Sequence, residues 1–266
     1  MKKWYLYLLA GLLCFALASC DKKDDPEEDK PTNYAPGEIP GLGDAEGELT
    51  GPPFRLPEGV ELISGISGGA THDGYWDLPE SYTASATFTR KDGSVVSRSF
   101  APQTRAGEVH YYFGSGAGYV DLLIPMRNTK SSSVTVTFPA ATVLRSESGN
   151  CQNGVLLKKV SVTIPGNSDY YLRLAFYCGN AHKSGAGGAD VYELEVVSDA
   201  KPLLDLCERL KNKKINIEEF TRTSYDDCTA YGSQVYDLQG ILWKVTDDTG
   251  LEDHDIRYIN ALPNSQ

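Results

Sequence analysis

The chain has 266 residues, which is enough for one large domain or two small ones, each with a hydrophobic core. Its formal net charge of −11 excludes a typical nucleic-acid binder, because neutralising phosphates requires a basic surface. The six cysteines show no CxxC spacing and no accompanying histidine cluster, so the sequence does not predict a zinc site.

The N-terminus has the features of an export signal. Lys2 and Lys3 precede the apolar run 4–18, which is too short for a typical membrane-spanning helix, and small residues follow it. We therefore expect a signal peptide over residues 1–19. Leu17-Ala-Ser-Cys20 resembles the lipobox of bacterial lipoproteins, which implies that Cys20 becomes the lipidated first residue. The alternative is simple secretion with Cys20 unmodified.

Residues 20–57 have low hydrophobicity, high charge at their start and many prolines and glycines. Such a composition has little to bury, so it predicts a disordered tether. Lys23, Asp24 and Asp25 resemble the surface-export signal of Bacteroidetes lipoproteins, and the alternative is an ordinary solvated spacer. The resemblance implies an outer-membrane lipoprotein exposed at the cell surface and held there by the lipid on Cys20.

Residues 58–198 consist of short alternating runs separated by turn residues. The runs 82–88 and 95–100 flank Lys91-Asp-Gly93, which is a hairpin signal. Similar spacing along the whole segment predicts a mainly β fold, an antiparallel β-sandwich or barrel-like domain. The other expected strands are 108–113, 119–124, 133–138, 142–145, 155–164, 170–178 and 190–197.

Residues 199–266 change to a helical period. Leu203, Leu206, Cys207 and Leu210 recur at helical spacing after Pro202, which suits a first turn. Further helices are expected over 233–246 and 251–262. We expect these helices to form a C-terminal helical subdomain packed on the strands.

Two residues could carry chemistry. Cys178 stands at the end of the strand 171–178, before the turn residues Gly179-Asn180, so a rigid element fixes it beside a loop. Gln239 lies at the edge of the buried face of its helix, where an unpaired carboxamide costs free energy. Each also has a structural explanation, since cysteine is a common core residue and a glutamine can bond nearby backbone.

The cysteine count leaves a second explanation open. Cys14 departs with the signal peptide and Cys20 carries the lipid, so four remain for the folded part: Cys151, Cys178, Cys207 and Cys228. An even number in an exported protein is typical of disulfides, here two of them. Two disulfides would leave Cys178 with no free thiol.

The segments 176–180 and 238–243, followed by Thr246-Asp247, resemble the motifs of thioester domains in bacterial surface adhesins. Those domains carry an aromatic-Cys motif at a strand end and a later hydrophobic-Gln-hydrophobic motif that commonly ends in Ile-Trp. The strands over 134–164 also look like the sheet that leads into such a cysteine, so the resemblance covers about 132–247. The motifs lie closer together than is usual in the family, and Gly240 stands where a larger residue is common.

The resemblance implies an internal thioester. The Cys178 sulfur would attack the Gln239 side-chain carbonyl and expel ammonia, and an amine on a host protein would later be acylated. His182 and Lys183, just beyond the cysteine, are candidates to assist, unless they are ordinary solvated loop residues. The implied protein is an adhesin with a single turnover and no metal or cofactor, rather than an enzyme.

The alternative is a non-covalent glycan-binding or accessory surface lipoprotein without a thioester. The aromatic pairs Tyr75-Trp76, Tyr111-Tyr112 and Tyr170-Tyr171 could stack on sugar rings, although aromatics in strands are more often core residues. No pair of facing carboxylates or nucleophile elbow indicates a hydrolase.

Overall fold

A computed structural model describes residues 31–68, 84–89, 95–100, 104–105, 108–109, 113–220 and 225–265, with backbone alone over 84–109 and 225–229. The predicted signal peptide, the lipidation site Cys20 and the export signal Lys23, Asp24 and Asp25 lie outside these residues. In the part of the chain that is described, no helix combines the length and the apolar character needed to cross a membrane.

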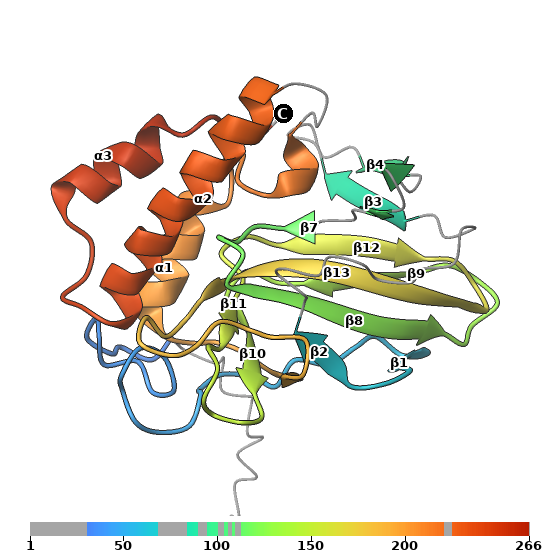
Figure 1. Ribbon diagram of the computed structural model, residues 1–266, viewed down its shortest axis with the longest axis horizontal. Coiled ribbons are helices and arrows are strands. Elements are labelled where there is room, and N and C mark those ends of the chain that lie inside the picture. Colours follow the sequence, from blue (N-terminus) through green and yellow to red (C-terminus); the bar gives the residue numbers. More distant parts are fainter. Residues whose placement is uncertain are drawn as a thin grey trace, which may run out of the picture. The chain divides into compact units, whose positions relative to one another are not determined.

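Six antiparallel strands form a closed, barrel-like ring in the order β8-β2-β14-β10-β11-β13, with β13 pairing back to β8. The longest pairing joins β13 to β8, from Ser168 opposite Asn128 to Phe176 opposite Val120 (Figure 1). Short strands β1 (Val60–Leu62) and β7 (Phe113–Gly114) add to the edges of this sheet. The ring strands are β2 (Ile66–Gly68), β8 (Val120–Asn128), β10 (Thr142–Ser146), β11 (Gly154–Val155), β13 (Ser168–Cys178) and β14 (Val191–Val197).

A second antiparallel sheet has the order β4-β3-β12-β9 and confirms the hairpin expected around residues 91–93. Side chains of this sheet alternate, so Val136 and Val162 join the core of the ring while Thr135 and Thr163 pair on the exposed face. The mainly β class is therefore confirmed. The strands are β3 (Ala84–Thr89), β4 (Val95–Phe100), β9 (Val134–Phe138) and β12 (Val160–Ile164), and a separate ribbon pairs β5 (Thr104–Arg105) with β6 (Glu108–Val109).

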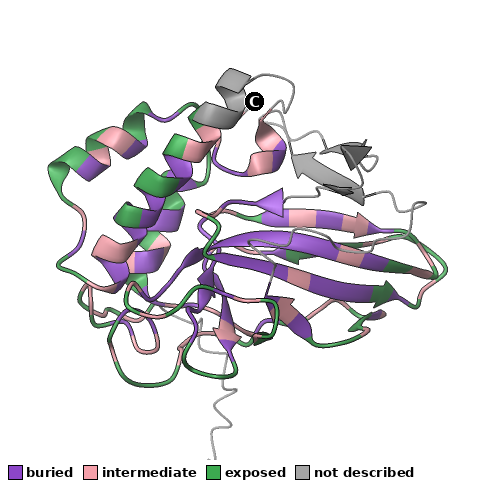
Figure 2. Cartoon of the chain, viewed as in Figure 1, coloured by how far each residue is buried: buried purple, intermediate pink, exposed green. Residues whose placement is uncertain are grey.

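Three α-helices of the described residues gather on one side of the ring (Figure 1). They are α1 (Lys201–Leu210), α2 (Tyr225–Thr246) and α3 (Asp253–Ala261), and a short 3-10 helix, η1 (Ile217–Glu219), precedes α2. The apolar stripe predicted for the first helix is buried as expected, and α2 begins earlier than the pattern indicated. The helices bury their inner faces in a second hydrophobic cluster that also contains Val143 and Tyr177 of the ring (Figure 2).

Residues 31–57 correct one prediction, because this part of the expected tether is folded. Ile39 and Leu42 are fully buried in the helical core cluster. The backbone N–H of Gly37 donates to the carbonyl of Val245 at 2.9 Å. A Cβ added to Gly43 would lie 2.0 Å from the Thr246 carbonyl oxygen, so glycine is required for this close approach. The prediction from composition was wrong because a few apolar residues, together with backbone contacts that glycines permit, hold this segment against the rest of the fold.

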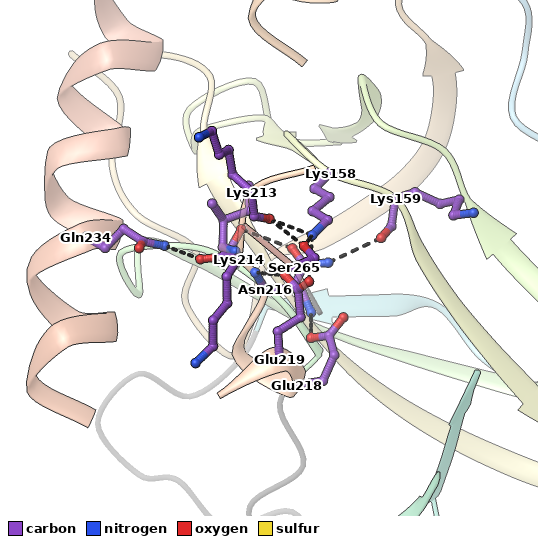
Figure 3. Close-up of polar contacts among 12 residues, drawn as sticks. Lys158, Lys159, Lys213, Lys214, Asn216, Glu218, Glu219, Gln234 and Ser265 are labelled. Atoms are coloured by element: carbon purple, nitrogen blue, oxygen red, sulfur yellow. Dashed lines mark hydrogen bonds and ion pairs between the residues drawn. The ribbon is translucent and has the colours of Figure 1, made fainter. Parts of the chain in front are cut away.

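Residues 31–266 form one compact unit, in which the helices after residue 198 pack together with the strands. A charged cluster helps to join its strands to its C-terminal end (Figure 3). Lys158 Nζ, just before β12, donates to Lys213 O, Glu219 Oε1 and Ser265 Oγ, each at 2.6 Å. The Ser265 N–H in turn donates to the Asn212 carbonyl. We call the cluster of Lys158, Lys213, Glu219 and Ser265 the Lys158 clasp.

Candidate functional site at the end of strand β13

Cys178 and Gln239 meet where the end of β13 faces α2. The backbone N–H of Cys178 donates to Gln239 Oε1 at 2.8 Å, and Gln239 Nε2 donates to the Cys178 carbonyl at 2.9 Å. Both residues are buried. The carboxamide thus pairs with the cysteine backbone in the way that a neighbouring strand would, and the structure brings together the two residues that the motifs singled out.

The local sequence explains why this pairing forms. Leu238 and Leu242 anchor α2 in the hydrophobic cluster, which carries the intervening Gln239 into the interior. A buried carboxamide is tolerated when its donor and acceptor are both satisfied, and leaving one unsatisfied costs about 1–3 kcal/mol. Cys178 supplies both partners because its N–H and C=O stand at the last position of the strand.

The Cys178 sulfur is held by the loop that follows it. Sγ donates to the Asn180 carbonyl at 3.2 Å, and the Asn180 N–H lies 3.4 Å from Sγ. Burial raises the pKa of the Cys178 thiol to about 11, against the opposing effects of the Asn180 backbone and the Trp243 indole. The group is therefore a neutral thiol at neutral pH, and becomes a nucleophile only after losing its proton.

Trp243 lies one helical turn after Gln239 and packs against the hydrophobic cluster that contains Cys178. Its indole Nε1 is buried without a hydrogen-bond partner, yet the indole lies close enough to the thiol to lower the pKa of Cys178. The ring is tilted against Tyr119 at 6.0 Å between centroids, and Tyr119 is 37% exposed. From the sequence, Trp243 was identified only as the end of a motif, because its unpaired N–H depends on tertiary packing.

Asp247, just past the end of α2, is the carboxylate whose charge acts on the Cys178 thiol. Its Oδ1 accepts from the Ala181 N–H at 3.0 Å and its Oδ2 from the Thr246 hydroxyl at 2.6 Å. Partial burial raises the pKa of Asp247 despite those two bonds. The negative charge of Asp247 also raises the pKa of Cys178, so this residue opposes formation of the thiolate.

The N-terminal segment covers the loop after the cysteine. Asn180 Nδ2 donates to the Gly43 carbonyl at 2.9 Å and to the Gly41 carbonyl at 3.3 Å. The Gly43 N–H donates to the Gly179 carbonyl at 2.7 Å. Sequence reasoning missed this role because it treated the segment as a tether, although the closely spaced glycines at 37, 41, 43 and 47 were a signal of turns.

The two residues expected to assist make their contacts elsewhere. His182 is an exposed side chain whose Nε2 lies 3.8 Å from the Asp44 carboxylate. Lys183 contributes its backbone carbonyl to the side-chain amide of Gln152. Neither contact reaches the sulfur, because adjacency along a loop does not fix the direction of a side chain.

The described cysteines are free thiols. Cys151, Cys178 and Cys207 form no disulfide, which contradicts the alternative of two bridges, and the side chain of Cys228 lies outside the described residues. Cys207 is buried beside the Leu156 carbonyl, and burial raises its pKa to about 12. The free sulfur that a thioester needs is therefore available at Cys178.

One group of potential metal ligands occurs among the described residues. Glu252, His254 and Asp255 bring their ligand atoms within 4.8 Å of one another. The ammonium of Lys244 lies 2.9 Å from Asp255 Oδ2 and 3.6 Å from Glu252 Oε2, so a protein cation already balances these oxygens. The cluster is mostly exposed and has the features of a surface ion-pair network.

No protein-family model, no curated protein and no solved structure matches the chain. The chemistry of the site therefore follows from its own contacts. The backbone of a cysteine with a buried thiol holds a buried carboxamide, and its N–H group donates to the carboxamide oxygen. Such an N–H stabilises negative charge that develops on the oxygen during acyl transfer.

Proposed function

We propose that this protein is a cell-surface lipoprotein adhesin in which Cys178 and Gln239 form an internal thioester that acylates an amine on a partner. The observation that carries the proposal is the reciprocal pair of hydrogen bonds between the Gln239 carboxamide and the Cys178 backbone. Holding the two reactants in one geometry converts their reaction into an intramolecular step.

Thioester formation follows from these contacts. The deprotonated Cys178 sulfur attacks the side-chain carbonyl carbon of Gln239, and the Cys178 N–H stabilises the oxyanion. The C–N bond of the carboxamide then breaks, and the amide nitrogen leaves as ammonia with the proton that the thiol released. The Cys178 carbonyl orients the departing nitrogen, since it accepts a hydrogen bond from Nε2.

Burial supports the second half of the proposal. Cys178 and Gln239 are 0% and 1% exposed, which keeps water away from the acyl carbon. A partner amine that reaches the carbon forms an amide with Gln239 and releases the Cys178 thiol. The acylated glutamine remains part of the chain, so each molecule reacts once and is not an enzyme.

The setting of this reaction is the cell surface. The lipobox-like ending at Cys20 and the export-like residues Lys23, Asp24 and Asp25 support an outer-membrane lipoprotein whose folded part faces outward. A lysine of a host protein is the amine that such a surface meets. The membrane contact is the lipid on Cys20, and the acidic chain has no nucleic-acid partner.

The alternative function is non-covalent glycan binding at the same surface. Of the aromatic pairs named for it, Tyr170 is buried in the core and Tyr171 is partly buried against it. The side chains of Tyr75, Trp76, Tyr111 and Tyr112 lie outside the described part of the chain. Tyr119 and Tyr236 are exposed aromatics that remain available.

Intact-mass measurement of the purified, unreduced mature protein tests the proposal. We expect a mass lower than the sequence mass by one ammonia, and we expect Cys178→Ala and Gln239→Ala each to restore the full mass. An unsubstituted protein whose mass equals the sequence mass, with no loss of ammonia, contradicts the thioester. Retention on a glycan array by such a protein would favour the alternative.

A further inference from the structure

The indole N–H of Trp243 is a buried donor without a partner. Trp243 Nε1 is one of five buried side-chain polar atoms without a hydrogen bond among the described residues. Leaving a buried donor unpaired costs free energy, so such a group in a folded protein calls for a physical explanation. The position of Trp243 fits one such explanation, in which the indole N–H has an acceptor that becomes negatively charged only during a reaction.

The position follows from the helix. Gln239 and Trp243 are four residues apart on α2, so their side chains lie on the same face, one turn from each other. Gln239 contacts the backbone of Cys178, and Trp243 packs against the core cluster to which the Cys178 side chain belongs, close enough for its indole to lower the pKa of the thiol. One turn of α2 thus places Gln239 at the backbone of Cys178 and Trp243 near its side chain.

We propose that Trp243 is a catalytic residue of the thioester reaction and that its indole N–H donates to the Cys178 sulfur whenever this atom carries negative charge. The inference rests on the proposed function. In the thiol form that the structure holds, the sulfur donates a hydrogen bond to the Asn180 carbonyl, and the indole N–H is left without a strong acceptor. A thiolate is a much better acceptor, so the bond is stronger in the reacting state than in the ground state.

The step balances as follows. The amine nitrogen attacks the thioester carbon, the C–S bond breaks, and its electron pair stays on Sγ as a thiolate. The indole N–H and the Asn180 N–H donate to this thiolate. A proton from the attacking nitrogen then moves to Sγ, which gives the amide on Gln239 and the free Cys178 thiol.

Other charges around the sulfur act in the opposite sense or do not reach it. Asp247, beyond the end of α2, raises the pKa of Cys178, and Asp44 and His182 act on Asp247. Tyr192 of β14 also couples electrostatically to Cys178, and its hydroxyl donates to the Gln152 carbonyl. Described cationic groups are not among the causes that shift the pKa of Cys178, which leaves neutral N–H donors to stabilise the thiolate.

The test removes the N–H while keeping the ring. Trp243 is replaced site-specifically by benzothienylalanine, which has sulfur in place of the indole nitrogen, and separately by phenylalanine. Tyr236→Phe, an exposed position on the same helix, is the matched control. The measured quantity is the rate at which methylamine cleaves the thioester, followed by intact mass.

We expect both Trp243 variants to form the thioester but to react with methylamine about tenfold to a hundredfold more slowly, the range for a hydrogen bond to a charged group. The control should keep the unsubstituted rate. Equal rates in the benzothienylalanine variant and the unsubstituted protein would overturn the inference, because only packing would then be needed.

A second readout does not depend on the thioester. The pH profile of Cys178 alkylation by iodoacetamide is followed on the peptide that contains Cys178, in methylamine-treated protein or, where no thioester forms, in untreated protein. Loss of the N–H should move the midpoint upward by about one pKa unit or more, equivalent to a tenfold change. An unchanged midpoint contradicts the inference, whereas a full mass in the unsubstituted protein contradicts the proposed function.

Discussion

The Cys178–Gln239 junction and the Lys158 clasp both join strands to the C-terminal part of the chain, but they do so in different ways. In the clasp a charged ammonium donates to three oxygens at 2.6 Å, one of them a carboxylate (Figure 3). In the junction two neutral groups pair, a thiol has a raised pKa, and an indole N–H is left without a partner. A fully satisfied network stabilises the fold, whereas unsatisfied groups around a nucleophile indicate chemistry.

The largest expected effect concerns the clasp. Lys158→Ala leaves the Glu219 carboxylate, whose side chain is 14% exposed, without its cation, and removing one partner of such a mostly buried pair costs up to about 3–5 kcal/mol. Chemical denaturation should show this loss of unfolding free energy, and intact mass should still show loss of ammonia. Lys201→Ala, which breaks an exposed pair with Asp205, is the control and should cost less than about 1 kcal/mol. If Lys158→Ala were as stable as this control, the Lys158 clasp would not be the stabilising region that distinguishes it from the Cys178–Gln239 junction.

A smaller effect is expected at the junction. Gln239→Leu keeps an apolar side chain of similar size but leaves the N–H and C=O of Cys178 unsatisfied, at about 1–3 kcal/mol for such a group. The same denaturation experiment measures it, with methylamine-treated protein as the reference, because there the thioester is open and Gln239 again carries an amide N–H. A variant that is more stable than the unsubstituted protein would show that the carboxamide is retained for its chemistry and contributes no net stability.

Glu218, beside the clasp, gives a pH dependence. Burial raises the pKa of Glu218 to about 8, and its Oε2 accepts from the Gly114 N–H at 2.8 Å. The folded state therefore binds the proton more tightly than the unfolded state, so stability falls as the pH rises from about 4.5 to about 8. Glu218→Gln should flatten this decline in plots of Tm against pH. An unchanged slope in the variant would assign the decline to other groups.

The smallest effect is expected from Asp247→Asn, which keeps the acceptor for the Ala181 N–H but removes the negative charge. Loss of that charge lowers the pKa of Cys178, so the thiolate fraction rises. Alkylation of Cys178 at a fixed pH below this pKa should accelerate about threefold to tenfold in methylamine-treated protein. Slower alkylation would mean that Asp247 holds the loop rather than opposing the charge.

Much of the fold was predictable from the sequence because it depends on local periodicity. Alternation predicted β13 and its neighbours, and the helical stripe at Leu203, Leu206, Cys207 and Leu210 predicted α1. The folded segment 31–57 was not predictable from composition, since its burial depends on glycine contacts with distant backbone. Such contacts have no local pattern.

The candidate site was predictable in part. The two motifs singled out Cys178 and Gln239, but the reciprocal hydrogen bonds between them are a tertiary property of residues 61 positions apart. The unpaired N–H of Trp243 and the position of Asp247 emerge only when α2 packs against the end of β13. His182, which was expected to assist, is exposed and contacts Asp44, since closeness in sequence does not direct its side chain toward the sulfur.

Tandem mass spectrometry of the proteolysed protein after treatment with methylamine tests the central claim most directly. The account predicts that one methylamine is attached to the side chain of Gln239 and that Cys178 becomes available to a thiol reagent in the same molecules. Methylamine on no residue, or on Gln239 equally in the Cys178→Ala variant, would contradict it.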